Sequence, residues 1–211
     1  MKVLNLYAGI GGNRKLWTDV EVTAVEINPQ IAKIYQDFFP QDKVIVADAH
    51  QYLLDHFKEF EFIWSSPPCP THSKLGMCRY FNDNPITGCH IKNLRYPDMR
   101  LYEEIILLKT FCETKWVVEN VVGYYEPLIY AQEIHRHYFW SNFIIRNINF
   151  SGGDKIEKGL ISDLEKRVGF DLGKYKNFGR KNTILRNCVL LELGLHILNE
   201  SKRNIQAELF V

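Results

Sequence analysis

Cys69 stands in the stretch WSSPPCP, residues 64–70, where two prolines stiffen the chain immediately before a thiol. A thiol at such a turn can be inert, can bind a metal or can act as a nucleophile. The candidate ligands for a metal site here are Cys69, His72, Cys78, Cys89 and His90. Their spacing lacks the close pairs of ligands that structural zinc sites have. The inert and the nucleophilic roles of Cys69 stay open at this point.

Three acids also stand where chemistry is possible, because each follows a short apolar run. Glu26 suits a ribose diol, since a carboxylate can accept two hydroxyl hydrogen bonds. Asp48 can accept a hydrogen bond from an exocyclic adenine amine. Together these two acids describe an adenosine pocket, and Glu119 is a candidate acid for catalysis.

A glycine turn, YAGIGG at residues 7–12, precedes the first of these acids. It resembles a dinucleotide fingerprint but departs from GxGxxG, so a nicotinamide cofactor is one reading of it. The sequence contains no GxxxxGK[ST], which argues against a P-loop.

The elements that must position these groups are five short apolar runs, which we predict to be β-strands. They cover residues 2–8, 22–28, 43–49, 60–66 and 114–121. Helical patterns begin at Pro29 and Asp98. This alternation predicts an α/β, Rossmann-like fold with a mostly parallel sheet and helices on both faces. Ligands of such sheets bind at the carboxyl ends of the strands, where the glycines, the three acids and Cys69 all fall.

The remaining segments are less regular. We predict a hairpin or two short strands over residues 138–150 and an amphipathic helix over residues 189–200. Residues 70–97 form a long polar loop, which in a compact domain is usually functional or mobile. Residues 151–186 are polar and basic.

Composition is that of an ordinary globular chain. The 211 residues suffice for one well-buried core, with 46% hydrophobic and 24% charged residues. The net charge of +1 means that any nucleic-acid surface must be local. Five cysteines give no disulfide framework, and no signal peptide or membrane span is visible, so a cytoplasmic protein is expected, in a host cell if phage-encoded. Cys78, Cys89, Cys112 and Cys188 are expected to be ordinary thiols.

Seven motifs in order resemble those of the cytosine-C5 DNA methyltransferase family, over about residues 1–150 and 183–200. They are NLYAGIGG (5–12), VEIN (25–28), ADAH (47–50), SPPCPTHS (66–73), PDMRL (97–101), VVENV (117–121) and RNCVLLELG (186–194). The resemblance implies a class I fold that binds S-adenosyl-L-methionine. The implied cofactor-binding residues are Tyr7, Ala8, Gly9, Ile10, Gly11, Gly12, Glu26, Ile27, Asp48, Ala49, Pro67, Asn187 and Val189.

The resemblance also implies a mechanism. A Cys69 thiolate would add to cytosine C6, and Glu119 would share a proton at N3. Asn120 would hold the catalytic loop, and the loop of about residues 70–97 would close over a flipped base in duplex DNA. Arg136 matches the second arginine of the family's Arg-x-Arg motif. Arg100 and Arg136 are candidates for the positive charge that would lower the pKa of the thiol.

Three features depart from the family pattern. Pro70 replaces the usual Gln after the catalytic cysteine, and Ile134 replaces the first arginine of Arg-x-Arg. Only about residues 151–185 stand in the place of a target-recognition domain. We therefore predict a catalytic domain of residues 1–150 and 183–211 with a short basic insertion at 151–182.

The insertion and the catalytic loop carry the candidate nucleic-acid contacts. They are Ser73, Lys74, Lys174, Lys176, Arg180 and Lys181. Basic residues interleaved with Tyr175 and Phe178 suit a phosphate backbone and unstacked bases, although a solvated basic loop has the same composition. So short an element predicts relaxed sequence specificity or help from a partner protein.

The function that these observations favour is a DNA cytosine-5 methyltransferase that needs no metal or membrane. Compact forms of this kind look like the methyltransferases of phages and mobile elements, including those of restriction-modification systems. The alternatives are a C5 methyltransferase of RNA or a free pyrimidine nucleotide, and a non-catalytic relative that binds DNA or the cofactor.

Overall fold

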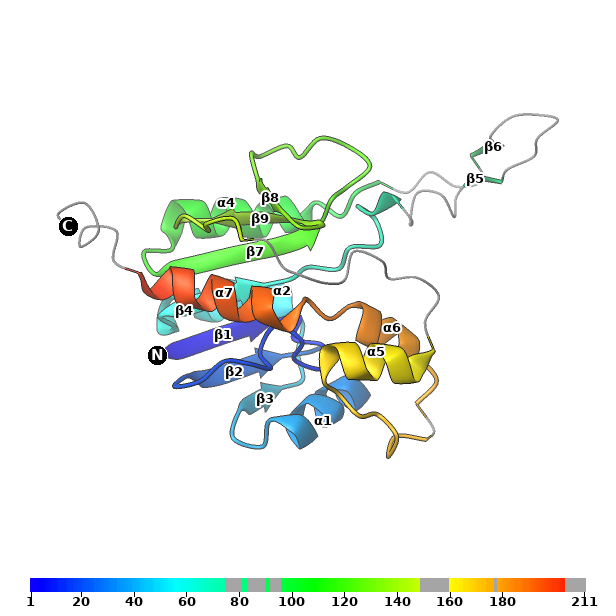
Figure 1. The fold of residues 1–211 in the computed structure, drawn as a ribbon. Coiled ribbons are helices and arrows are strands. Elements are labelled where there is room, and N and C mark those ends of the chain that lie inside the picture. Colours follow the sequence, from blue (N-terminus) through cyan, green and yellow to red (C-terminus); the bar gives the residue numbers. More distant parts are fainter. Residues whose placement is uncertain (75–80, 83–89, 92–95, 149–159, 177, 204–211) are drawn as a thin grey trace.

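The computed structural model describes residues 1–74, 81–82, 90–91, 96–148, 160–176 and 178–203, and it is built around one seven-stranded sheet (Figure 1). The strand order is β3-β2-β1-β4-β7-β9-β8. The strands are β1 (Lys2–Leu6), β2 (Glu21–Val25), β3 (Lys43–Ile45), β4 (Phe62–Ser65), β7 (Lys115–Val121), β8 (Gln132–Ile134) and β9 (His137–Ser141). A separate antiparallel pair joins β5 (Phe81–Asn82) to β6 (His90–Ile91).

The sheet is parallel except at β9, which runs antiparallel to both β7 and β8. The chain first builds outward from β1 through β2 to β3 and then continues on the other side of β1 with β4. This reversal between β1 and β4 is the point at which ligands bind in open α/β sheets. The predicted Rossmann-like fold is confirmed.

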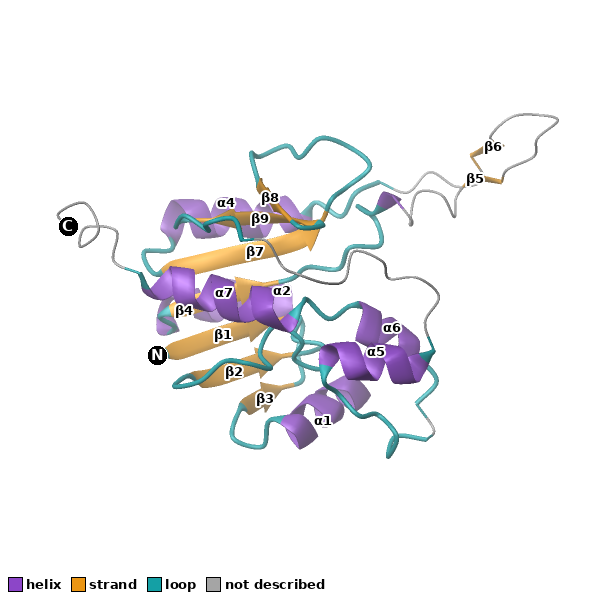
Figure 2. Ribbon diagram, in the orientation of Figure 1, coloured by secondary structure: helices purple, strands orange, loops and turns teal. Residues whose placement is uncertain are grey.

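Helices cover both faces of the sheet (Figure 2). They are α1 (Pro29–Phe38), α2 (Ala49–His56), α4 (Arg100–Phe111), α5 (Ile161–Val168), α6 (Lys181–Arg186) and α7 (Leu191–Lys202), with a short 3-10 helix at Phe57–Glu59. Helices α2 and α4 pack on one face, and α7 lies across the other. None of the described helices is long and apolar enough to cross a bilayer.

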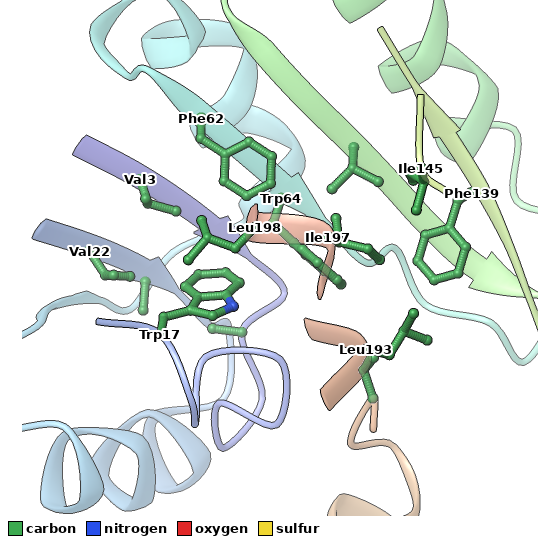
Figure 3. Packing of buried hydrophobic residues seen from close by; sticks show 14 of the residues in the cluster. Val3, Trp17, Val22, Phe62, Trp64, Phe139, Ile145, Leu193, Ile197 and Leu198 are labelled. Atoms are coloured by element: carbon green, nitrogen blue, oxygen red, sulfur yellow. The ribbon is translucent and has the colours of Figure 1, made fainter. Parts of the chain in front are cut away.

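Alternating side chains of each central strand enter two different cores, as the two-residue period of a strand requires. In β1, Val3 packs with the α7 residues Leu193 and Ile197, whereas Leu4 packs on the opposite face with Leu53 of α2. Figure 3 shows the α7 side, where Trp17 lies among the strand residues. Burial on both faces explains why these strands read as continuous apolar runs.

One expectation about the second half of the chain is wrong. The hairpin is formed by β8 and β9, residues 132–141, and residues 142–148 continue without a strand. Helices α5 and α6 lie in the polar and basic segment, for which the sequence predicted no secondary structure. Leu164 and Val168 form a one-sided apolar stripe on α5, and Gly169 ends this helix in the left-handed conformation, with φ 64°.

Helices α5 and α6 share a third core with the first half of the chain. Leu164, Phe170 and Leu185 pack together with Ile10 of the glycine turn and Ile34 of α1. The predicted domain boundary between residues 182 and 183 falls within α6. Helix α6 therefore packs onto the core that the predicted catalytic domain supplies, and the division into domains stays a prediction.

Candidate active site

Cys69 and Glu119 follow neighbouring strands at the same edge of the sheet. Strand β4 pairs with β7 through Ser65 and Val118, so the chain beyond Ser65 emerges beside Glu119. Glu119 is 7% exposed, and Cys69 is half-buried. The negative charge of Glu119 raises the pKa of the Cys69 thiol, after the larger effect of burial. The structure therefore brings together the thiol and the acid that the sequence assigned to catalysis.

Hydrogen bonds fix the turn that carries Cys69. Asn120 Nδ2 donates to the carbonyl oxygen of Pro67 over 3.0 Å. The carbonyl oxygen of Cys69 accepts from the backbone amides of His72 and Ser73, both at 3.0 Å. These contacts hold the thiol at a turn with little freedom, because Pro67 and Pro68 restrict the backbone before it.

A second set of contacts joins this turn to the segment after β7. His72 Nδ1 lies 2.6 Å from the hydroxyl oxygen of Tyr125, and the backbone amide of Tyr124 donates to His72 over 3.1 Å. Ser73, a predicted nucleic-acid contact, forms an isolated antiparallel bridge with Gly123. The sequence singled out His72 only as a candidate metal ligand within SPPCPTHS, and it did not single out Tyr125, which lies in none of the motifs.

The expected lowering of the Cys69 pKa by an arginine is not what the structure shows. Burial and the charge of Glu119 raise this pKa instead. Arg100 is engaged elsewhere, since its Nη2 lies 2.9 Å from Asp98 Oδ2. Arg136 is an exposed residue in the turn between β8 and β9. Neither arginine is among the groups that shift the pKa of Cys69 in the described parts of the chain.

Glu119→Gln is expected to lower the pKa of Cys69, because the neutral amide removes a charge that opposes the thiolate. Alkylation of Cys69 by iodoacetamide at about pH 8 should become faster, as measured by mass spectrometry of the Cys69 peptide. Cys188 serves as the internal control, since burial raises its pKa to about 12 and keeps it slow in both proteins. Equal Cys69 rates in the two proteins would contradict the electrostatic coupling.

The glycine turn lies at the carboxyl end of β1 with Glu26 bound to it. Gly9 and Gly11 have φ angles of 55° and 85°, which glycine adopts without strain. Glu26 Oε2 accepts from the amide of Gly9 over 3.0 Å, and Oε1 accepts from the amide of Asn28 over 2.8 Å. Each carboxylate oxygen keeps a further lone pair for a ligand hydroxyl.

Gly9 borders open space, whereas the other two glycines of the turn are tightly packed. A Cβ on Gly9 would meet no atom within 4 Å. A Cβ on Gly11 would lie 2.4 Å from the ring of Phe39, and one on Gly12 would lie 2.6 Å from Cβ of Cys188. The turn therefore has space for a ligand beside Gly9. At Gly12 the absence of a side chain lets Cys188 of the C-terminal segment pack against the turn.

The C-terminal segment is also held at a second point. Trp17 Nε1 donates to the carbonyl oxygen of Gly194 over 3.0 Å. A Cβ on Gly194 would lie 2.4 Å from the backbone oxygen of Asn13. The start of α7 therefore packs directly on the glycine turn, which places the residues before it beside the cofactor candidates.

The cofactor candidates differ in what they can offer a ligand. Ile27 is 65% exposed at the end of β2. Asp48 caps α2 by accepting from the amide of His50 over 2.9 Å, and its side chain is 47% exposed. Asn187 is exposed after α6. The side chains of the remaining apolar candidates are buried, so only their backbone can face a ligand: Ala8, Ile10, Ala49, Pro67 and Val189.

Tyr7 belongs to a buried polar network that the sequence reading did not identify. Its hydroxyl donates to Glu104 Oε1 over 2.6 Å, and Ser65 Oγ donates to Glu104 Oε2 over 2.6 Å. His50 Nδ1 lies 3.1 Å from the same carboxylate, which raises the pKa of His50. This network joins the ends of β1 and β4 to α4, close in sequence to the glycine turn and the Cys69 turn.

Lys174, one of the candidate nucleic-acid contacts, is engaged within the fold. Lys174 Nζ lies 3.5 Å from Asp37 Oδ2 and also lies over the rings of Phe38 and Tyr175. The other basic candidates have no such role here: Lys74, Lys176 and Arg180 are exposed and Lys181 is half-buried. Lys174 thus helps to hold the segment after α5 against α1.

Several predicted features lie outside the described residues. Cys78, Cys89, the side chain of His90 and most of the loop at 70–97 belong to this group. Within the described parts of the chain, no group of three or more His, Cys, Asp or Glu residues could hold a metal ion.

Comparison with known proteins adds to this geometry. Residues 1–87 match the family model of the C-5 cytosine-specific DNA methylases. This match confirms the resemblance for the part of the chain that carries the glycine turn, Glu26, Asp48 and Cys69. Glu119 and Asn120 lie beyond it.

One curated relative and several solved structures are similar to parts of the chain. A tRNA (cytosine(38)-C(5))-methyltransferase of Spodoptera frugiperda is 31% identical over 90 residues, which cover 39% of this chain and 26% of that protein. A mutant of Spodoptera frugiperda DNMT2 is 26% identical with a TM-score of 0.37, over 58% of this chain and 36% of that one. Entamoeba histolytica methyltransferase EhMeth is 16% identical with a TM-score of 0.44, over 78% and 59%. The match thus spans about a quarter of the length of the curated relative.

Proposed function

We propose that this chain transfers a methyl group from S-adenosylmethionine to C5 of cytosine in DNA, through a covalent bond between Cys69 and cytosine C6. The observation that carries the proposal is the placement of Cys69 beside Glu119, on a turn that Asn120 holds at Pro67. Cytosine C5 is a weak nucleophile, and only addition of a thiolate at C6 makes it reactive enough to take a methyl group.

The two side chains divide this chemistry between them. The Cys69 thiolate forms the bond to C6 while a proton is placed on N3 by the Glu119 carboxyl group, so that the electron pair displaced from the C5–C6 bond becomes available at C5. After transfer, loss of the C5 proton to water re-forms the C5–C6 double bond and expels the thiolate, and the N3 proton returns to the Glu119 carboxylate. The charge of Glu119 opposes ionisation of the Cys69 thiol, so transfer of the Glu119 proton to N3 and formation of the thiolate bond to C6 are best coupled in one step.

S-adenosylmethionine supplies the methyl group as an electrophilic carbon, and the matched family supports it as the cofactor. The residues at the carboxyl end of β1 and β2 fit this group. The space beside Gly9 is open, Glu26 has lone pairs left for the ribose hydroxyls, and the exposed side chain of Ile27 offers an apolar surface for a base. Asp48 can accept from the adenine amine with its exposed carboxylate.

DNA is the proposed acceptor, and RNA is the second candidate. The name of the matched family favours DNA, whereas the matched curated relative is a tRNA methyltransferase. The basic side chains Lys176 and Arg180 can contact phosphates of either polymer. A phage or restriction-modification origin stays a prediction of the compact sequence alone.

A methyl-acceptor assay decides among these substrates. The purified chain is incubated with labelled S-adenosylmethionine and duplex DNA, single-stranded DNA, RNA or dCMP. We expect label in duplex DNA, which should compete with the other three acceptors in mixtures. Preferred labelling of RNA or dCMP would replace the DNA assignment, and no label in any acceptor would refute the proposed methyl transfer.

A further inference from the structure

His137 lies beside Glu119 on the side of the sheet that faces α7. Strand β7 pairs with β9 through Glu119 and Phe139 and through Val121 and His137, so Glu119 and His137 are diagonal neighbours on the same face. His137 Nε2 lies 3.5 Å from Glu119 Oε1. A small rotation of either side chain brings this distance within that of a hydrogen bond, as often occurs when a substrate binds.

The surroundings of His137 favour its neutral form. Burial lowers the pKa of its imidazole, the charge of Glu119 opposes this effect, and Arg136 and His135 add to it. Arg167 of α5 and Arg186 of α6 line one pocket together with Arg136 and His137. Among the charged residues named here, Glu119 is the one acidic group.

The surroundings of Nδ1 indicate which tautomer the neutral His137 ring adopts. Nδ1 of His137 is buried without a hydrogen-bond partner among the described residues. A bare acceptor is tolerated better in such a place than an orphaned N–H donor. The proton of the neutral ring therefore belongs on Nε2, the nitrogen that faces Glu119.

We propose that His137 is a positioning residue, whose Nε2–H holds Oε1 of the Glu119 carboxyl group so that Oε2 is directed at N3 of the cytosine. The inference rests on the proposed function. A neutral donor suits this task, because a lysine or arginine at this position would bind the carboxylate so strongly that the proton needed at N3 would be lost. The ring of Phe139 packs against the His137 imidazole in an edge-to-face arrangement, with the ring centroids 6.3 Å apart.

The contact is tested first without any assay of activity. ¹⁵N NMR of the imidazole in the intact chain should show the Nε2-protonated tautomer for His137. In Glu119→Gln the pKa of His137 should fall further, because the charge that opposes its lowering is removed. A His137 that titrates identically in both proteins, or that is protonated on Nδ1, would overturn the proposal.

The consequence for catalysis is tested with two variants. In His137→Leu we expect kcat to fall about 10- to 100-fold, with little change in KM for DNA or in S-adenosylmethionine binding. The pH profile of kcat should also change, because the Glu119 carboxyl group loses the N–H donor that contacts it. His137→Gln keeps an N–H near the position of Nε2 and should restore both kcat and the profile.

These readouts separate the contact from a packing role. Leucine fills the space of the ring, so wild-type kcat in His137→Leu, or failure of glutamine to restore it, would contradict positioning through the N–H. A wild-type protein that methylates no acceptor would refute the proposed function alone, because the NMR titration still decides whether His137 holds Glu119. The melting temperature of each variant excludes misfolding as the cause.

Discussion

Cys69→Ser is expected to lower the rate of methyl transfer by roughly 10⁴-fold or more, the usual effect of removing a catalytic nucleophile. A serine hydroxyl is much less acidic than a thiol, and the surroundings of residue 69 already disfavour an anion. Transfer of label from S-adenosylmethionine to DNA measures the effect. Cofactor binding by calorimetry should be unchanged, because the glycine turn and Glu26 do not depend on the thiol.

The role of Cys69 as nucleophile can also be tested directly, by trapping its covalent bond to cytosine. DNA that contains 5-fluorocytosine should form a stable adduct with the wild-type protein, since fluorine cannot leave C5 as a proton does. The adduct should appear as a shifted band under denaturing conditions, and its peptide should contain Cys69. Cys112→Ser is the matched control, because Cys112 lies at the C-terminal end of α4 and its thiol donates a hydrogen bond to the carbonyl oxygen of Thr114. A Cys69→Ser protein that keeps full activity would refute the covalent mechanism.

Gly12→Val is expected to destabilise the fold and to weaken cofactor binding together. The new side chain would overlap Cβ and the backbone of Cys188, at 2.6 and 2.8 Å, so the C-terminal segment must move away from the glycine turn. Overpacking of this kind costs about 1–3 kcal/mol. That cost corresponds to roughly 2–4 °C in Tm per kcal/mol for a chain of this size. The affinity for S-adenosylmethionine should fall about tenfold or more, which is about 1.4 kcal/mol.

Thermal unfolding and calorimetric titration measure these two effects. Gly179→Ala is the matched control, since a Cβ there would meet nothing within 4 Å, and both Tm and affinity should stay near wild type. A Gly12→Val protein with normal Tm and normal affinity would show that the approach of Cys188 is not needed for the cofactor site.

The sheet and the proximity of Cys69 to Glu119 could be predicted because the sequence signals are local. Residues such as Val3 and Leu4 are buried on opposite faces, so the strand reads as a continuous apolar run. Parallel strands then bring their carboxyl ends to one edge, which is why Cys69 and Glu119 could be placed together before the structure was known.

The hairpin was misplaced because apolar residues continue beyond it. Phe143 and Ile145 are buried in the core on the α7 side although they belong to no strand. Strand β8 has only three residues, of which Ile134 alone is buried, too short a pattern for recognition. Helix α5 was missed because its charged residues conceal a narrow apolar stripe.

The immediate surroundings of the catalytic pair could not be predicted for a different reason. His137 meets Glu119 only through the register of an antiparallel strand, and the sequence does not fix that register. Glu104 is fully buried, yet a single acid in a helical stretch gives no sign of the three groups that it binds. Its environment exists only once β1, β4 and α4 have come together.

The contact of Gly12 with Cys188, and of Trp17 with Gly194, has a consequence for the order of events during synthesis. The glycine turn leaves the ribosome early, but the segment that completes it follows more than 170 residues later, as the sequence separation of 177 between Trp17 and Gly194 shows. Until then the face that α7 covers stays open to solvent, with Phe62 and Val117 on it. Such long-range closure is slow to form and leaves the nascent chain exposed to aggregation. We therefore expect S-adenosylmethionine binding only after this segment has been made and has closed on the glycine turn.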